Sequence, residues 1–330
     1  MFSGRGASLR RWLPHLLLFV VVLIWSGNTV VSKLVMKDVP APQLVLVRFS
    51  LGVLAFHVPL LLAMGHRGAQ LSRSDVVRLF AIGAGGAGTS VLLFTIGLSY
   101  APATYTSLIS MIGPPLTALM AWVLFREVLG WTRALGTAIA FLGAALLVTG
   151  GQLADPQPGL LFGTSFLIAS QAAWAIYILY GKPLLAHRPP ILVMSASHAF
   201  ALLSVWPLSV PIGGWDFVWD AWHWSLGVWM GILYLAIVNT GLSQLMFLYA
   251  LREVSSAQAV SYTYLQPAMT AVMAMFALGE QPTVMTLACG VVILLGIWLV
   301  NRPRVILPAR NEVGAPGARR ADADVTAARR

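Results

Sequence analysis

The chain has 330 residues, of which 58% are hydrophobic and 10% are charged, and its mean hydropathy is +0.80. About a quarter of the residues in a soluble domain are charged, so this composition excludes a fold whose solvent is water. The net charge of +10 does not indicate nucleic-acid binding, because most of the basic residues lie at the ends of apolar segments or in the C-terminal tail. We therefore expect an all-α integral membrane protein, with the lipid bilayer as a partner and no nucleic acid.

Ten apolar segments follow one another along the chain, and each has about 20 residues, the length of a helix that spans a bilayer. We expect transmembrane helices at residues 14–37, 42–64, 76–99, 103–125, 131–150, 159–181, 190–211, 225–250, 255–278 and 283–301. The first segment follows Arg10 and Arg11, as in a signal peptide, but it lacks a small-residue cleavage site and is expected to remain uncleaved. Residues 1–13 form the expected cytoplasmic N-terminus, and the basic tail 302–330 is expected to be disordered.

The basic residues predict the orientation of the helices. With the N-terminus inside, eighteen Lys and Arg residues fall on the cytoplasmic side, and only Lys37 falls in an external link. Cytoplasmic loops carry the excess of Lys and Arg in membrane proteins. The sequence therefore predicts a multi-pass protein of a bacterial-type cytoplasmic (inner) membrane, with both termini in the cytoplasm.

The two halves of the chain resemble one another. Pro114 precedes Glu127 by 13 residues, and Pro267 precedes Glu280 by the same spacing, so the two pairs are offset by 153. Because five is an odd number of helices, the second set of five must be inverted relative to the first. We expect two five-helix repeats, residues 14–150 and residues 159–301. Inverted repeats commonly enclose a central site that opens to either face of the membrane.

Motifs at corresponding places in the halves resemble those of the EamA family in the drug/metabolite transporter superfamily. In the second half they are Tyr264-Leu265-Gln266-Pro267, Leu278-Gly279-Glu280, Gly290 and Gly296, and in the first half they are Pro115, Glu127, Gly136 and Gly143. Trp25-Ser26-Gly27-Asn28, Lys33 and Arg48 are similar to the opening motif of the family. In that motif the Trp and the Gly are usually adjacent, whereas Ser26 separates them here. The resemblance covers residues 14–301. It implies ten helices in an inverted 5+5 repeat and a group of metabolite exporters that includes exporters of amino acids and of aromatic amino acids, with varied substrates.

Four ionisable side chains within the segments are candidate substrate-binding residues, because charge inside a bilayer is costly. Lys33 lies close to the external end of its helix and could instead extend to the interface. Arg48 could hold a carboxylate or phosphate through two parallel hydrogen bonds, or it could anchor its helix at the interface. His57 and His198 lie deeper, where each could titrate, or could remain neutral and bond to a neighbouring helix.

Other polar and aromatic residues at similar depth complete the set of candidates. The polar ones could line a cavity or only bond between helices, and they are Asn28, Gln171, Asn239, Gln244 and Gln266. The aromatic ones could form walls for a ring-bearing substrate or lie at the interfaces, and they are Trp25, Tyr105, Trp174, Tyr177 and Tyr264. Three prolines near mid-membrane are expected to bend their helices, either as hinges or as static kinks, and they are Pro114, Pro115 and Pro267.

The pattern as a whole favours a secondary transporter that exports a small metabolite by alternating access, with amino acids as the leading class. No Asp or Glu lies at mid-membrane depth, which disfavours a cation–proton exchanger, and the glycine-rich run 83–88 lacks the Lys-Ser/Thr of an ATP-binding loop. The single cysteine, Cys289, cannot form a disulfide or a Cys-based metal site, and no metal, cofactor or enzymatic activity is expected. Two alternatives remain, export of drugs or other amphipathic compounds and a membrane scaffold without a solute path. We expect a monomer, with an oligomer left open.

Overall fold

The computed structural model describes residues 3–64, 71–126, 130–149, 158–213, 220–254 and 262–301, and within these ranges it contains helices and no strands. The helical elements of the first half are α1 (Ser3–Val35), α2 (Ala41–Gly52), η1 (Val53–His57), α3 (Val58–Met64), α4 (Arg73–Phe80), η3 (Ala81–Gly88), α5 (Thr89–Ser99), α6 (Ala103–Ser110), α7 (Gly113–Phe125) and α8 (Trp131–Val148). Those of the second half are α9 (Pro158–Leu185), α10 (Pro190–Gly213), η4 (Ala221–His223), α12 (Leu226–Leu233), η5 (Tyr234–Leu242), α13 (Ser243–Glu253), α15 (Gln266–Leu278) and α16 (Val284–Val300).

Eight helical stretches in the described part of the chain are long and apolar enough to cross a bilayer, and they coincide with the first eight predicted segments. They are Trp12–Val35, Ala41–Ala63, Arg73–Ser99, Ala103–Phe125, Trp131–Val148, Gly159–Leu185, Pro190–Ile212 and Leu226–Phe247. The last two predicted segments correspond to the shorter apolar helices α15 and α16. The predicted tail 302–330 lies outside the described residues, as do Glu127 and residues 255–261 of the ninth predicted segment.

Equivalent positions in the two halves adopt the same local backbone. Two π-helical segments, in which the helix widens by a fraction of a turn, begin at Ala81 (η3) and at Tyr234 (η5), an offset of 153. Helices α7 and α15 both end at a residue in the left-handed conformation, Arg126 with φ 54° and Gly279 with φ 69°, again 153 apart. The repeat in the sequence is therefore also a repeat in backbone conformation.

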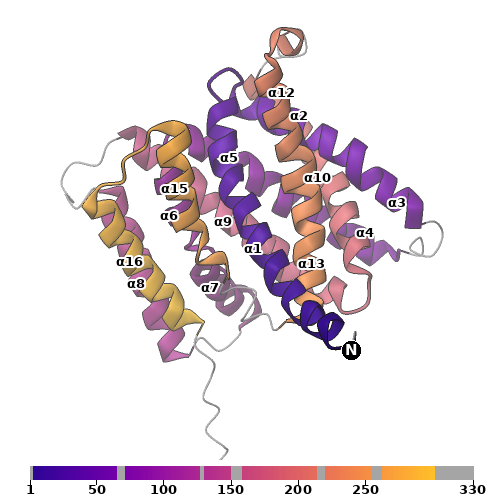
Figure 1. Cartoon of the computed structure of the whole chain (residues 1–330), viewed down its shortest axis with the longest axis horizontal. Coiled ribbons are helices and arrows are strands. Elements are labelled where there is room, and N and C mark those ends of the chain that lie inside the picture. Colours follow the sequence, from indigo (N-terminus) through magenta and orange to yellow (C-terminus); the bar gives the residue numbers. More distant parts are fainter. Residues whose placement is uncertain are drawn as a thin grey trace, which may run out of the picture.

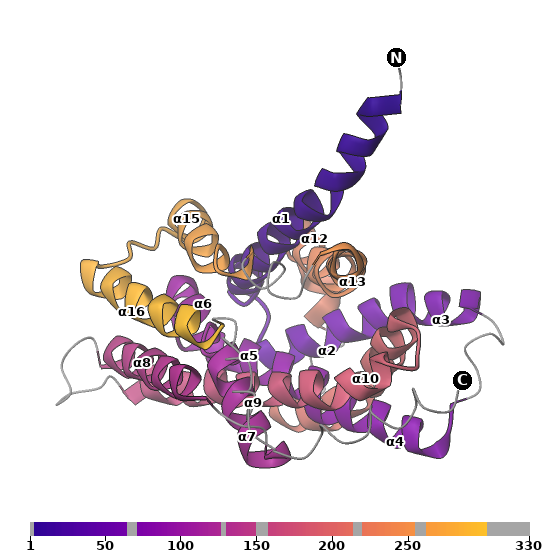
Figure 2. The ribbon, with the colours of Figure 1, turned by 90° about the horizontal axis from the view of Figure 1, so that it is seen from below.

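The two halves interlock rather than lying side by side (Figures 1 and 2). Helix α1 of the first half packs against α13 and α15 of the second half, while α9 packs against α5, α7 and η3 of the first half. Helices α8 and α16 form one edge of the bundle, and α3 and α4 lie toward the opposite edge in both views. A Cβ built on Gly136 of α8 would lie only 2.6 Å from the carbonyl oxygen of Gly296 on α16, so glycine permits this close approach.

The three prolines that were expected to bend helices lie at two breaks between successive helices. Pro114 and Pro115 lie in the first turn of α7, and Pro267 lies in the first turn of α15. The chain makes a turn at 111–112 and at 264–265, directly before these helices start. Proline is favoured in a first turn because its missing N–H would have no partner there. A role of these breaks as hinges stays a prediction.

Candidate functional site

One face of α1 is polar although the helix lies among apolar neighbours. Trp25, Asn28, Thr29 and Ser32 have the spacing that places side chains on the same side of an α-helix. Thr29 and Ser32 are buried, and their hydroxyls have no hydrogen-bond partner among the described residues. Since buried polar groups are normally paired, this face is a candidate lining for a polar ligand.

Arg48 lies at the centre of the candidate site. Its side chain is 2% exposed, and its two terminal nitrogens each donate a hydrogen bond of 3.2 Å, one to Asn28 Oδ1 and one to Thr240 Oγ1. The third nitrogen, Nε, is buried without a partner, and within the described ranges no carboxylate forms an ion pair with the guanidinium. Arg48 therefore joins α1 and α2 of the first half to η5 of the second while its positive charge stays uncompensated.

Thr240 was not selected from the sequence, although it follows the candidate Asn239. Its hydroxyl donates to the carbonyl oxygen of Leu235 at 2.8 Å, five residues earlier, which is the spacing of a π-helical turn. The lone pairs of the same hydroxyl accept from Arg48. The widened helix thus holds the threonine in the orientation that contacts the guanidinium.

Tyr234 is a second residue that sequence reasoning missed. Its hydroxyl donates to the carbonyl oxygen of Ile24 at 2.9 Å, and a Cβ on Gly27 would lie 2.6 Å from that hydroxyl. Glycine at position 27 therefore leaves room for this contact, because a larger residue would displace the Tyr234 hydroxyl. The glycine of that motif was a signal that some group approaches α1 closely, but the sequence could not identify the group.

Several second-half candidates gather on the same side of α1. Trp25 donates from Nε1 to Ser243 Oγ at 3.0 Å, and its ring lies 5.2 Å from that of Phe247. Asn239 is buried, and its Oδ1 has no partner among the described residues. The backbone carbonyl of Gln266 accepts a hydrogen bond of 3.3 Å from the Ser26 hydroxyl. Gln244 is half-buried on α13, next in the chain to Ser243. Elements α1, α2 and η5 thus meet at these residues, and the role of Trp25, Asn28, Arg48 and Asn239 in substrate binding stays a prediction.

A second stripe of candidates lies on α9. The rings of Trp174 and Tyr177 stack, with centroids 4.9 Å apart and an angle of 15° between their planes. Gln171, one turn earlier, directs its Oε1 at Gly113, where a Cβ would lie only 2.7 Å from it. Because α9 packs against α5, α7 and η3, this stripe lies at the interface between the halves.

The two candidate histidines form a pair. His57, at the end of η1, and His198, on α10, stack with their ring centroids 4.5 Å apart. Both side chains are buried. Helix α2, which carries Arg48, also packs directly against α10.

Three candidates lie apart from Arg48, and their role in binding stays a prediction. Tyr105 bonds to Thr164 Oγ1 at 2.8 Å in an apolar core between α6, α8, α9 and α16. Tyr264 packs against the same core and bonds to Asn301.

The third of these candidates, Lys33, lines a cavity of about 320 Å³ together with Glu280. The Glu280 carboxylate accepts hydrogen bonds from the backbone N–H of Ala103 at 2.5 Å and of Thr104 at 3.0 Å, and from the Thr104 hydroxyl at 2.9 Å. Glu280 therefore caps the start of α6.

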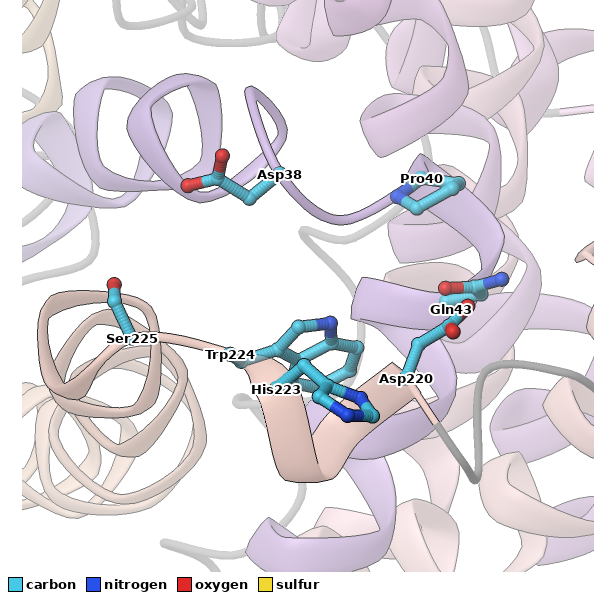
Figure 3. Close-up of a pocket in the computed structure, with 7 residues that line it drawn as sticks. All are labelled: Asp38, Pro40, Gln43, Asp220, His223, Trp224 and Ser225. Atoms are coloured by element: carbon cyan, nitrogen blue, oxygen red, sulfur yellow. The ribbon is translucent and has the colours of Figure 1, made fainter.

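A larger cavity, of about 530 Å³, opens where α1 joins α2 (Figure 3). Asp38 lies on one side of it, and Asp220 and His223 lie on the other. None of the predicted site residues lines it. We place the candidate site around Arg48 rather than here, because buried unpartnered polar groups gather at Arg48. Among the described residues no group of three or more His, Cys, Asp and Glu side chains could hold a metal ion.

Comparison with known proteins is consistent across sequence and structure. The profile of the EamA-like transporter family matches residues 12–149 and again residues 161–302. A crystal structure that is 18% identical in sequence aligns with a TM-score of 0.58 over 88% of this chain and 96% of the other. At that identity, the structural likeness shows a shared fold only.

Three curated relatives indicate the range of the family. An uncharacterized transporter of Archaeoglobus fulgidus is 28% identical over 87% of this chain and 96% of its own length. The threonine/homoserine exporter RhtA of Escherichia coli is 29% identical over 87% of this chain and 92% of its own length. A probable terminal-alkyne amino-acid exporter of Streptantibioticus cattleyicolor is 27% identical, over 79% and 85%.

Proposed function

Since this chain belongs to the EamA-like transporter family, we propose that it exports a small metabolite, with amino acids as the leading class, across a bacterial cytoplasmic membrane. The family and the named relatives are transporters and not enzymes, and the helices that cross the membrane agree with a multi-pass transporter. Transport is secondary and uses no ATP.

The buried guanidinium of Arg48 is the observation that carries the substrate class. A charge inside a membrane protein that lacks a protein counter-ion favours a ligand of opposite charge. The planar guanidinium matches a carboxylate through two parallel hydrogen bonds, and its Nε is free to donate. A zwitterionic amino acid supplies such a carboxylate without adding net charge, and two relatives are named as amino-acid exporters.

Alternating access is supported by the arrangement of the halves. We propose ten transmembrane helices in two five-helix repeats, because η3 and η5 begin 153 residues apart and α1 and α9 have equivalent partners across the halves. An odd number of helices in each repeat would make the second repeat inverted, and the excess of Lys and Arg in the links supports cytoplasmic termini. Arg48 lies at the contact between the halves, since it bonds to Asn28 in one and Thr240 in the other. Movement of one half against the other would break one of these bonds and expose the site to one face.

Counterflow in proteoliposomes tests this function. Vesicles loaded with an unlabelled amino acid should take up the same labelled amino acid transiently and saturably, and the screen covers the twenty common amino acids and homoserine. Empty vesicles and an Arg48→Gln variant are the controls. If no amino acid shows counterflow, the proposed substrate class is wrong.

Export of aromatic or amphipathic compounds is the second candidate function. The stacked Trp174 and Tyr177 and the contact between Trp25 and Phe247 provide flat apolar surfaces that suit a ring. The same vesicles distinguish the two functions, because transport of an uncharged aromatic compound should not depend on Arg48.

A further inference from the structure

Two histidines from different halves of the chain are held together in a dry environment. The rings of His57 and His198 lie 4.5 Å apart at an angle of 19°, and the side chains are 0% and 6% exposed. Phe49 also stacks on His198, with centroids 6.2 Å apart, and Phe56 contacts His57 edge-on at 5.3 Å. Aromatic rings therefore cover part of the pair.

The hydrogen bonds of the pair leave ring nitrogens able to bind a proton. Nδ1 of His198 lies 2.8 Å from the carbonyl oxygen of Met194, and because a carbonyl only accepts, this nitrogen carries the hydrogen. In the neutral ring, Nε2 of His198 then has a lone pair. Nδ1 of His57 pairs with Ser195 Oγ at 3.3 Å, while its Nε2 is buried and has no partner. One turn of α10 thus holds both rings.

The surroundings allow one additional proton at most. Two charged imidazole rings in contact would repel each other, and Arg48 is close enough to repel a charge on His198. The other titratable groups on the packed elements are Tyr234 on η5, Tyr177, Tyr180 and Lys182 on α9, and Arg73, Asp75 and Arg78 on α4. Segments α3, η3 and α5 carry none, and Asp75 pairs with His187 and Arg188 rather than with the two histidines. Within the described residues, no carboxylate compensates a charge on the pair.

We propose that the His57–His198 pair is the proton-binding site of this transporter and that one proton is exchanged for one amino acid. This inference rests on the proposed function. When the carboxylate of an amino acid is bound to Arg48, the ammonium group of the same amino acid lies within a few ångströms of Arg48. A protonated His198 would repel that ammonium group. The site therefore binds either the substrate or the proton.

The exchange is coupled to movement because the pair connects η1 of the first half to α10 of the second. A neutral pair stacks in the dry position that the structure shows. A protonated pair requires water or an acceptor, so it favours the arrangement in which η1 and α10 separate. Proton release on the other side of the membrane allows the rings to stack again.

The experiment compares counterflow with accumulation driven by a pH gradient, in proteoliposomes held at zero membrane potential. The probes are the twenty common amino acids and homoserine, each radiolabelled. A gradient of one pH unit should support up to about tenfold accumulation of a transported amino acid by the wild type. In the variants His57→Gln and His198→Gln, the accumulation ratio should fall to one. His15→Gln is the matched control, because His15 lies elsewhere and bonds to Tyr262 at 3.0 Å, and it should behave as the wild type.

Proton release on substrate binding, measured with a pH-sensitive dye in detergent, gives a second readout on the purified wild type. One proton per bound amino acid supports the inference, and no release overturns it even if a histidine variant fails to fold. Counterflow without any response to the gradient, or a full response in both histidine variants, also overturns it while the proposed function stands. If the wild type shows no counterflow of any probe, both the proposed function and this inference are wrong.

Discussion

Replacement of Arg48 by Gln should separate substrate binding from stability. The guanidinium donates two hydrogen bonds, and a bond from a charged donor contributes about 1.5–3 kcal/mol. Against this, a charge inside a membrane helix costs up to about 2.5–3.5 kcal/mol by insertion scales, and the unpartnered Nε costs about 1–3 kcal/mol. The two sides nearly cancel, so we expect Arg48→Gln to change the free energy of unfolding by no more than about 1 kcal/mol.

Transport should respond much more strongly. A carboxylate bound by Arg48 would lose two charge-assisted hydrogen bonds, and the Gln amide could replace only one neutral bond. A net loss of about 2–4 kcal/mol corresponds to a roughly 30- to 900-fold weaker affinity. Arg48→Lys, which keeps the charge but not the planar geometry, should give an intermediate loss.

Both quantities can be measured on the same preparation. The half-saturation concentration for counterflow reports the affinity. Thermal unfolding can be followed with a thiol-reactive fluorophore, because Cys289 is the only cysteine of the chain and is 2% exposed. The reasoning is refuted if Arg48→Gln carries amino acids with the wild-type half-saturation concentration. It is also refuted if this variant loses several kcal/mol of stability, since Arg48 would then be a structural residue.

The same unfolding assay checks three further predictions. Glu280→Gln should lower stability by about 1–3 kcal/mol. The two carboxylate oxygens accept one hydrogen bond from Ala103 and two from Thr104, whereas an amide has a single accepting oxygen and cannot accept all three. Gly279→Ala should cost about 1–2 kcal/mol through its positive φ alone, since a Cβ there would meet nothing within 4 Å. Gly136→Val should lower the free energy of unfolding by about 1–3 kcal/mol, because the added side chain would push α8 away from Gly296 on α16.

Each of these has an outcome that would count against it. Glu253→Gln, at an exposed position, is the control for Glu280, and equal unfolding midpoints for the two variants would mean that the carboxylate does not hold α6. A wild-type midpoint for Gly279→Ala would exclude a left-handed residue at the end of α15. If Gly136→Val leaves the midpoint unchanged, α8 and α16 are not in close contact.

The sequence was sufficient to predict the membrane helices because their signal is local. A bilayer requires about 20 consecutive apolar residues, so eight predicted segments agree with membrane-length helices to within a few residues at each end. The prolines predict bends, because a proline acts on its own turn of helix, whereas the structure has breaks between successive helices at these positions. Orientation, which depends on the charge of links, remains a prediction from the sequence.

The contacts between side chains depended on the tertiary structure, since they join residues far apart in the chain. Arg48 was a candidate because a buried cation is unusual, but Thr240 and Tyr234 have no local signal that distinguishes them from other hydroxyl-bearing residues. Likewise, no spacing rule brings Ser195 to His57.

The sequence by itself determined a membrane bundle with a repeated half and a family resemblance. It also determined a short set of polar residues whose burial among apolar helices costs free energy. Only the packing of α1 and α2 against η5, and of α10 against η1, decided which of those residues meet. The reason is physical: hydropathy and helix breaks act over one or two turns, whereas a site between two interlocked halves is assembled from helices whose order in space the local sequence does not specify.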